Sequence, residues 1–288
     1  MQERMRVMVA VDGSIYSAAA VNDLRRAGLP ADAEVRVIAV ADTTAAPPVS
    51  EFDLVSLAST RIDSVLSREN AYRQLVLSES TRSATEAADS VKDEFPAMRV
   101  SHEVLQGKPA DELLRVAWEW EPDLIVTGSH GHTTIKRFIL GSVSSAITEK
   151  AEASVRIVPR RFDTPEGIAA KLLIGVRGAI DAEQVVDALK DRIWPQGTQI
   201  RMMVINNAAR QAGDPTVDQL ALYEGIAKPL SGPWSHVSVD IRTGEAQTLL
   251  LAEAESWRAD SLFIPASSLG ASAAGLVAGG ICPVEVVR

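Results

Sequence analysis

Short apolar runs rich in β-branched residues alternate along this chain with longer segments of helical character. The first five runs are Val7–Val11, Val35–Val40, Met98–Leu105, Leu124–Thr127 and Val155–Val158. Apolar runs of this length, bounded by turn residues, are typical of buried strands. Continuous apolar strands separated by helices predict a parallel sheet that is covered by helices on both faces.

Three intervening segments predict helices. The first follows the initial run and places apolar side chains at a helical period, at Ala18, Ala19, Val21, Leu24 and Leu29. The second is Pro109–Trp120, with two carboxylates in its first turn, where the helix dipole favours them. The third runs from Val143 to about Glu149. Three tryptophans fall at apolar positions of predicted helices, so we expect each to be packed: Trp118, Trp120 and Trp257.

The same pattern then restarts. Leu172–Val176 matches Val7–Val11, and Ile200–Ile205 matches Val35–Val40. The best internal match aligns Val100–Thr127 with Val237–Pro265, pairing Gly107 with Gly244, Trp120 with Trp257 and Asp123 with Asp260. Val284–Val287 matches Val155–Val158. The repeat predicts two copies of one α/β unit, residues 1–162 and 168–288, joined near a polar segment that contains Pro165 and Gly167.

Length and composition agree with this organisation. A chain of 288 residues suits two domains of about 140 residues each. Hydrophobic residues make up 46% and charged residues 23%, which excludes disordered and fibrous classes. The formal net charge of −9 offers no electrostatic footprint for nucleic acid or an anionic membrane, so we expect neither as a partner. The single cysteine, Cys282, cannot form an internal disulfide, and we expect it to be buried and unreactive.

One uncharged segment, Leu262–Val284, is long enough to span a bilayer. It contains Pro265, Pro283 and several glycines and serines, and such a composition is a poor membrane span. We therefore expect a strand, a small-residue helix or linker, and another strand. The apolar run Val7–Val11 is too short for the core of a signal peptide, so the sequence favours a cytoplasmic protein.

Glycines after the fourth run carry the clearest chemistry. Gly128, Gly131, Gly141 and Ser142 form a G-x-x-G-x9-G-S string that opens a predicted helix. Glycines let backbone N–H groups approach an anion closely, and a helix N-terminus presents free N–H groups and a positive dipole end. The string therefore predicts a phosphate cradle. Because its donors are mainly backbone, an acidic chain can form it.

Asp12 follows the first run directly, in the string Val11-Asp12-Gly13-Ser14. Ligands of open parallel sheets lie beyond the carboxyl ends of strands, where the strand order reverses. If the first and fourth strands are neighbours there, Asp12 and Gly128 face one crevice. The carboxylate suits ribose hydroxyls better than phosphates, although Asp12 could instead cap the following helix.

These strings resemble those of the universal stress protein family, whose ATP-binding signature combines G-x-x-G-x9-G-[ST] with an early Val-Asp-Gly-Ser. Gly107-Lys108-Pro109, opening a helix before Pro122-Asp123-Leu124-Ile125-Val126, is similar to the family as well. The resemblance covers the chain as a tandem protein, with a close first copy and a loose second copy. It implies two flavodoxin-like (Rossmann-like) α/β domains, each a five-stranded parallel sheet in the order 3-2-1-4-5 with helices on both faces.

The resemblance also implies an ATP site in the first domain, with Mg²⁺ across the phosphates and no catalytic or metal-ligating side chain. By position, Ala10 and the backbone of Val40 line the adenine, and Asp12 meets the ribose. Thr127, Gly128, His130 and Gly131 border the ribose and phosphates. The phosphate chain lies on Gly141, Ser142, Val143 and Ser144. The family also implies a stress-response or regulatory role with a protein partner that the sequence does not identify.

The second copy departs from the pattern, because Arg177 replaces the early aspartate and no glycine string follows Phe263-Ile264-Pro265. We expect it not to bind ATP in this way. Arg177 is either a surface residue or fills the vacant crevice. Tandem members are expected to form an intramolecular pseudo-dimer, with Val155–Val158 pairing Val284–Val287. Whether two chains assemble further stays open.

Two other functions remain alternatives: slow ATP hydrolysis or nucleotidyl transfer, and a scaffold that binds no nucleotide and keeps a relic of the motif. His130 and His132 resemble a metal pair, but no third ligand is spaced to join them.

Overall fold

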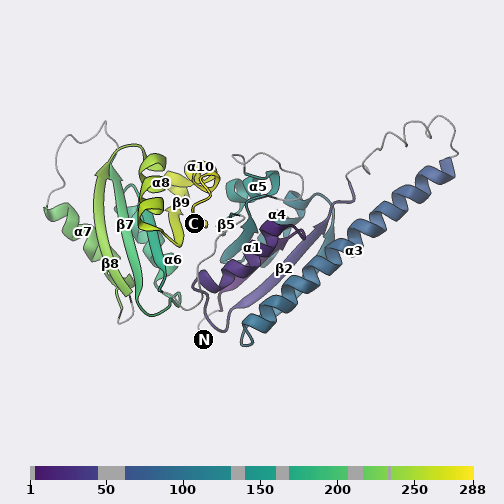
Figure 1. Ribbon diagram of the computed structural model, residues 1–288, viewed down its shortest axis with the longest axis horizontal. Helices are drawn as coiled ribbons and strands as arrows, with labels where there is room; N and C mark the ends of the chain where they lie inside the picture. Colours follow the sequence, from purple (N-terminus) through teal and green to yellow (C-terminus); the bar gives the residue numbers. More distant parts are fainter. Residues whose placement is uncertain (1–3, 45–61, 131–139, 160–168, 207–216, 233–234) are drawn as a thin grey trace.

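A computed structural model describes residues 4–44, 62–130, 140–159, 169–206, 217–232 and 235–288. In its N-terminal half, strands and helices alternate (Figure 1). The elements are β1 (Arg6–Val11), α1 (Ile15–Asp23), the 3-10 turn η1 (Leu24–Arg26), β2 (Glu34–Ala41), α3 (Ile62–Glu94), β3 (Arg99–Gln106), α4 (Pro109–Trp120), β4 (Leu124–Gly128), α5 (Ser142–Lys150) and β5 (Ser154–Val158).

The C-terminal half repeats this order with shorter connections. Its elements are β6 (Lys171–Val176), α6 (Ala179–Leu189), β7 (Thr198–Asn206), α7 (Val217–Ala227), η2 (Lys228–Leu230), β8 (Ser235–Thr243), α8 (Ala246–Trp257), β9 (Ser261–Pro265), α9 (Ala266–Leu269), η3 (Gly270–Ser272), α10 (Ala273–Ala278) and β10 (Val284–Val287). The segment Leu262–Val284 is thus strand, short helices and strand, as the small residues and prolines predict. Among the described residues, no helix is both long and apolar enough to cross a membrane.

All ten strands form one sheet in the order β3-β2-β1-β4-β5-β10-β9-β6-β7-β8. Each half contributes five parallel strands in the expected order 3-2-1-4-5. The halves meet where β5 pairs antiparallel with β10, which confirms the predicted pairing of these two strands. The junction between the two copies falls in residues 160–168, outside the described residues, so its boundaries remain a prediction.

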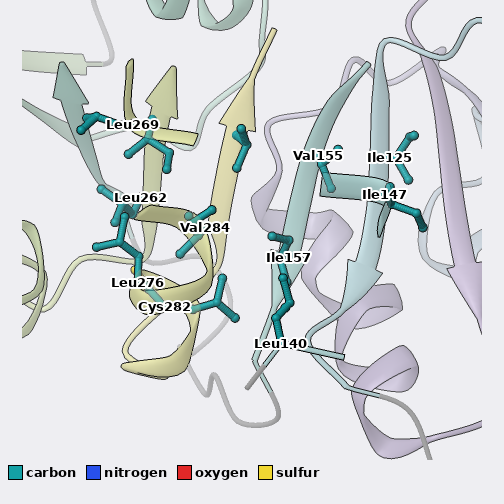
Figure 2. Close-up of a cluster of buried hydrophobic side chains, with 14 of the residues drawn as sticks. Ile125, Leu140, Ile147, Val155, Ile157, Leu262, Leu269, Leu276, Cys282 and Val284 are labelled. Atoms are coloured by element: carbon teal, nitrogen blue, oxygen red, sulfur yellow. The ribbon is translucent and has the colours of Figure 1, made fainter. Parts of the chain in front are cut away.

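Alternation along the strands assigns side chains to two faces of the sheet. On one face, Met8 and Ile125 pack with α4 and α5 in a core that continues across the β5–β10 pair to Leu262 and Val284 (Figure 2). On the other face, each half has a core of its own, under α1 and α3 in one and under α6 in the other. The inner strands of both half-sheets are buried on both faces, which explains their continuous apolar runs, whereas the outermost strands β3 and β8 are half-buried or exposed.

The best internal match of the sequence has a structural cause. Asp123 accepts the backbone N–H of Arg6 at 2.6 Å, and Asp260 accepts that of Lys171 at 2.7 Å. In both halves an arginine of the second strand lies 4.4 Å from the ring of the matching tryptophan, Arg36 over Trp120 and Arg201 over Trp257. These contacts stabilise the end of each half-sheet at which the parallel strands begin. The glycine string lies at the other end, where the strands finish.

Two expectations about helices were wrong. The first helix was predicted to extend to Leu29, but α1 ends at Asp23 and a 3-10 turn follows, because Gly28 takes a positive φ of 66° and turns the chain toward β2. Trp118 was expected to be packed, yet it is 72% exposed. It lies two residues before Trp120 and therefore projects from a different side of α4.

Candidate functional site

The carboxyl ends of β1 and β4 lie side by side where the strand order reverses. Val9 of β1 pairs with Val126 of β4, so Asp12 and Gly128 leave the sheet at the same edge. The two halves of the predicted site, which are more than a hundred residues apart in the sequence, therefore share one edge. This edge is the usual ligand position in open α/β sheets.

Asp12 is exposed and shapes the turn into α1. Its Oδ1 accepts the N–H of Ser14 at 2.9 Å, and Gly13 between them takes a positive φ of 78°. The N-cap of α1 is Ser14, whose hydroxyl accepts the N–H of Ser17 at 3.2 Å. The interpretation of Asp12 as the helix cap was therefore wrong. The turn holds its carboxylate at the edge of the sheet.

The start of α5 is held against the end of β4 by backbone contacts. The N–H of Gly141 donates to the carbonyl of Ser129 at 2.9 Å, and the N–H of Ser145 donates to the carbonyl of Gly141 at 2.8 Å. Gly141 is the N-cap and has no side chain to cap the helix. Among the residues that the structure describes, none accepts a hydrogen bond from the amides of Ser142, Val143 or Ser144. These first-turn amides are the donors that an anion at a helix N-terminus uses.

Small polar side chains fasten this junction from within. The Ser144 hydroxyl is buried and donates to the carbonyl of Gly128 at 2.6 Å, and the Thr127 hydroxyl lies 3.5 Å from it. Gly128 is required by close packing, because a Cβ there would lie 2.7 Å from the backbone carbon of Tyr16. The Ser144 hydroxyl is thus used in a hydrogen bond within the protein. The contact of Ser144 with phosphate therefore stays a prediction for its backbone N–H.

His130 follows directly. Its Nδ1 lies 3.0 Å from the Ser129 hydroxyl, and its ring centroid lies 5.1 Å from that of Tyr16. Its Nε2 is buried, with no hydrogen-bond partner among the described residues. Gly131 and His132 lie outside the described residues, and the part of the chain described contains no group of three His, Cys, Asp or Glu side chains suited to a metal.

The proposed adenine residues lie on one face of the sheet. Ala10 is buried and Val40 is half-buried, and both belong to or pack against the core beneath α4 and α5. Thr127 faces the same side, since its hydroxyl reaches Ser144 of α5. The structure therefore brings Ala10, Asp12, Val40, Thr127 and the start of α5 to one face and one edge.

Two contact residues were missed in the sequence, Tyr16 and Ser129. Tyr16 packs against Gly128 and His130, and the Ser129 backbone joins β5 to α5 by accepting from Gly141 and donating to Val158 at 2.8 Å. Ser129 stands inside the glycine string, so its position could have pointed to it. No pattern marks Tyr16, because an aromatic residue in a first turn is common.

The equivalent edge of the C-terminal half is occupied by its own side chains. Arg177 is exposed, which fits the surface interpretation. Its backbone N–H donates at 3.1 Å to the buried carboxylate of Asp181, which also accepts the hydroxyls of Ser267 and Ser268. α9 begins directly after β9 with no intervening loop. At this edge a protein carboxylate thus accepts the Arg177 amide and the Ser267 and Ser268 hydroxyls.

Comparison with known proteins identifies the family of this chain. The model of the universal stress protein family matches residues 3–159, more than half of the chain. The chain belongs to the universal stress protein family. Universal stress protein MJ0531 of Methanocaldococcus jannaschii is 26% identical over 158 residues, which are 54% of this chain and 82% of that protein. Universal stress protein YxiE of Bacillus subtilis is 26% identical over 153 residues, 53% of this chain and 97% of that protein.

A solved universal stress protein shares the whole two-half architecture. The crystal structure of a universal stress protein from Archaeoglobus fulgidus covers 98% of this chain and 96% of its own, with a TM-score of 0.61 and 18% identity. At that identity the likeness shows the fold alone. It extends over both halves, whereas the family model matches the first.

Proposed function

We propose that the N-terminal half of this universal stress protein binds ATP with Mg²⁺ and that the nucleotide regulates a stress-response protein. The observation that carries the proposal is the group of first-turn amides of Ser142, Val143 and Ser144, which has no acceptor among the described residues. These amides lie at the same edge as Asp12. A helix N-terminus next to a carboxylate suits a ligand with both phosphates and sugar hydroxyls.

Each part of the nucleotide has a separate set of contacts. The phosphates accept from the amides at the start of α5, and Asp12 accepts from the ribose hydroxyls. Ala10 and Val40 provide an apolar wall for the adenine, in line with the mostly apolar lining of ligand sites. Mg²⁺ would offset the negative charge of the bound phosphates. The helix dipole and backbone donors allow binding despite a net charge of −9.

Isothermal titration of the full chain with ATP, with and without Mg²⁺, tests this proposal. We expect saturable binding, and a loss of roughly 10- to 100-fold in affinity for Asp12→Ala, because hydrogen bonds to a charged acceptor contribute about 1.5–3 kcal/mol. Adding Gly141→Val should abolish binding while circular dichroism stays unchanged. Titration with AMP and cAMP establishes how many phosphates the site takes.

Arg177→Ala is the matched control, since Arg177 holds the position equivalent to Asp12 and is exposed. It should bind ATP like the parent chain. Absence of heat with millimolar ATP, or normal binding by the double variant, would sink the proposal. Absence of binding would leave the scaffold function, and the purified protein should then also lack bound nucleotide by absorbance near 260 nm. Normal binding by the double variant would instead place the nucleotide at another site.

Slow hydrolysis is the second candidate, and His130 is the observation that favours testing it. Its buried Nε2 has no described partner, so it could take a proton at this edge. Sustained phosphate release that is lost in His130→Ala would identify an enzyme. Stoichiometric binding without release leaves the regulatory function.

A further inference from the structure

Four charged side chains are buried between the two halves of the chain. Arg156 of β5 and Glu285 of β10 are direct partners in the antiparallel pair, and both are fully buried. Arg156 donates to Asp23 of α1 at 2.5 Å and to Glu285 at 3.4 Å. Glu285 also accepts from Arg192, which follows α6, at 3.0 Å. We call these four residues the seam charges.

The seam charges alternate in sign across the interface. Their order is Asp23, Arg156, Glu285, Arg192, so every charge lies beside an opposite one and the sum is zero. Additional hydrogen bonds satisfy the guanidinium groups, from Arg156 to the Ser261 hydroxyl at 2.8 Å and from Arg192 to the Ala27 carbonyl at 3.0 Å. Asp23 is the exception, because its Oδ1 is buried with no hydrogen-bond partner among the described residues and burial raises the pKa of its carboxyl. Removing one partner of a buried ion pair is far more costly than an equivalent change at the surface.

The two central charges occupy equivalent positions of the repeat. Val155–Val158 matches Val284–Val287, so Arg156 and Glu285 are the same position in the two copies. If the edge of β5 paired with β5 of another chain in this register, Arg156 would face Arg156. Two β10 strands would likewise place Glu285 against Glu285. Each central charge would keep the partner of its own half, Asp23 for Arg156 and Arg192 for Glu285, but would meet a like charge across the seam. Like charges directly opposite each other in a sheet are destabilising, and burial removes the water that would screen them.

The opposite face of β5 and β10 does not distinguish one copy of the repeat from the other. Val155, Ile157, Val284 and Val286 face the continuous apolar core, which would accept either copy of the repeat. Figure 2 shows Ile157 and Val284 in this core. Apolar contact supplies attraction there, whereas the charged face decides which edges are compatible.

We infer that the seam charges make the outer edge of β5 a heterotypic docking surface, which takes an edge strand with a carboxylate at its centre. The partner it fits is the second half of this tandem chain, its own or that of another copy, and a second copy of the first half is rejected. The device opposes the edge-to-edge association that unpaired strand edges otherwise invite. This inference does not depend on nucleotide binding.

Complementary charge reversals in the full chain test the inference. Arg156→Glu leaves its chain with two facing carboxylates, and Glu285→Arg leaves its chain with two facing guanidinium groups. Neither variant has a compatible partner within itself or in a second copy. When the two are mixed, the second half of the first variant and the first half of the other restore all four charges in one seam. The two remaining halves bring the substituted side chains together, and these have opposite signs. We expect a 1:1 heterodimer of twice the chain mass by light scattering, and no such species from either variant alone.

The matched control reverses an exposed ion pair, Lys190 with Asp187, whose side chains are 43% and 70% exposed. Mixing Lys190→Glu with Asp187→Lys should give no heterodimer. The inference is overturned if the folded seam variants fail to combine, if each pairs with itself equally well, or if the control pair also combines.

Neutral variants cover the case in which charge reversal prevents folding. Arg156→Gln and Glu285→Gln should each lower the urea midpoint, and the doubly neutral chain should lose clearly less than the sum of the two losses. Such non-additivity is expected because each single change leaves a buried charge without its partner. Strictly additive losses would contradict partner discrimination by these residues.

Discussion

The Ser144 hydroxyl donates a 2.6 Å hydrogen bond to the carbonyl of Gly128. This contact fastens the first turn of α5 to the last residue of β4, so the amides at the start of α5 stay at the edge where Asp12 leaves β1. A serine that the sequence assigned to a phosphate therefore positions the backbone around it.

Ser144→Ala should lower the free energy of unfolding by about 1–2 kcal/mol, because it removes the shorter of two hydroxyl hydrogen bonds to the Gly128 carbonyl and leaves that of Thr127 at 3.3 Å. Urea unfolding measures this loss. Ser142→Ala is the control, since Ser142 is exposed in the same turn and its change should stay within about 0.5 kcal/mol. Equal losses in the two variants would show that the contact with Gly128 contributes little.

Gly128→Ala should destabilise the chain by roughly 1–3 kcal/mol, because its Cβ would lie 2.7 Å from the backbone of Tyr16 and push α1 away from β4. Gly225→Ala gives the opposite expectation. Gly225 lies within α7, and a Cβ added there would meet nothing within 4 Å, so alanine should stabilise the helix by up to about 1 kcal/mol. Thermal unfolding of both variants measures the contrast, and a stabilised Gly128→Ala chain would contradict the packing described here.

Asp123→Ala and Asp260→Ala should both lower stability without changing nucleotide affinity, since they remove the same brace from the edge opposite the site. Asp260 is buried and Asp123 is exposed, so the second variant should lose more, about 2 kcal/mol against about 1. Chemical unfolding and ATP titration are measured together. A change in affinity for Asp123→Ala would link the brace to the site.

Burial raises the pKa of the Cys282 thiol to about 12. The folded chain therefore holds this proton more tightly than the unfolded chain, so stability is lost as pH rises above about 9, by about 1 kcal/mol per pH unit. Cys282→Ala should flatten the slope of unfolding free energy between pH 9 and 11. In the parent chain at pH 8, the thiol should react with a thiol reagent only on unfolding, and rapid reaction in the folded state would contradict this burial.

Sequence patterns predicted the strands well because most strands of each half-sheet are buried on both faces, although the outermost strands β3 and β8 are half-buried or exposed. Eight apolar runs coincide with strands to within two residues, from β1 at Arg6–Val11 to β10 at Val284–Val287. The internal match likewise identified equivalent positions, since the contacts of Asp123 and Asp260 are formed within each copy. The prediction that Trp118 is packed was wrong because a helical pattern shows that a helix forms but does not show which of its faces is buried. Packing against the rest of the protein decides that.

The candidate site was predictable where its chemistry is backbone chemistry. Gly141 and Asp12 could be identified from the sequence because a glycine at a helix start, combined with a carboxylate directly after a strand, is typical of a nucleotide site. The roles of Ser144 and Asp181 could not, because a short polar side chain serves a ligand or its own protein according to what lies within hydrogen-bonding distance.

The sequence by itself determined the repeated α/β unit, the strand order through its family resemblance, and the glycine string at one strand end. Local periodicity and turn chemistry are sufficient for the repeated unit and the glycine string, because both depend on near neighbours in the chain, whereas the strand order came only from the resemblance. Tertiary structure alone decided that Arg156 faces Glu285 inside the protein and that Asp181 satisfies the donors of the second edge. Those relationships depend on register and packing between segments distant in the sequence, and no local pattern encodes which buried charge will meet which.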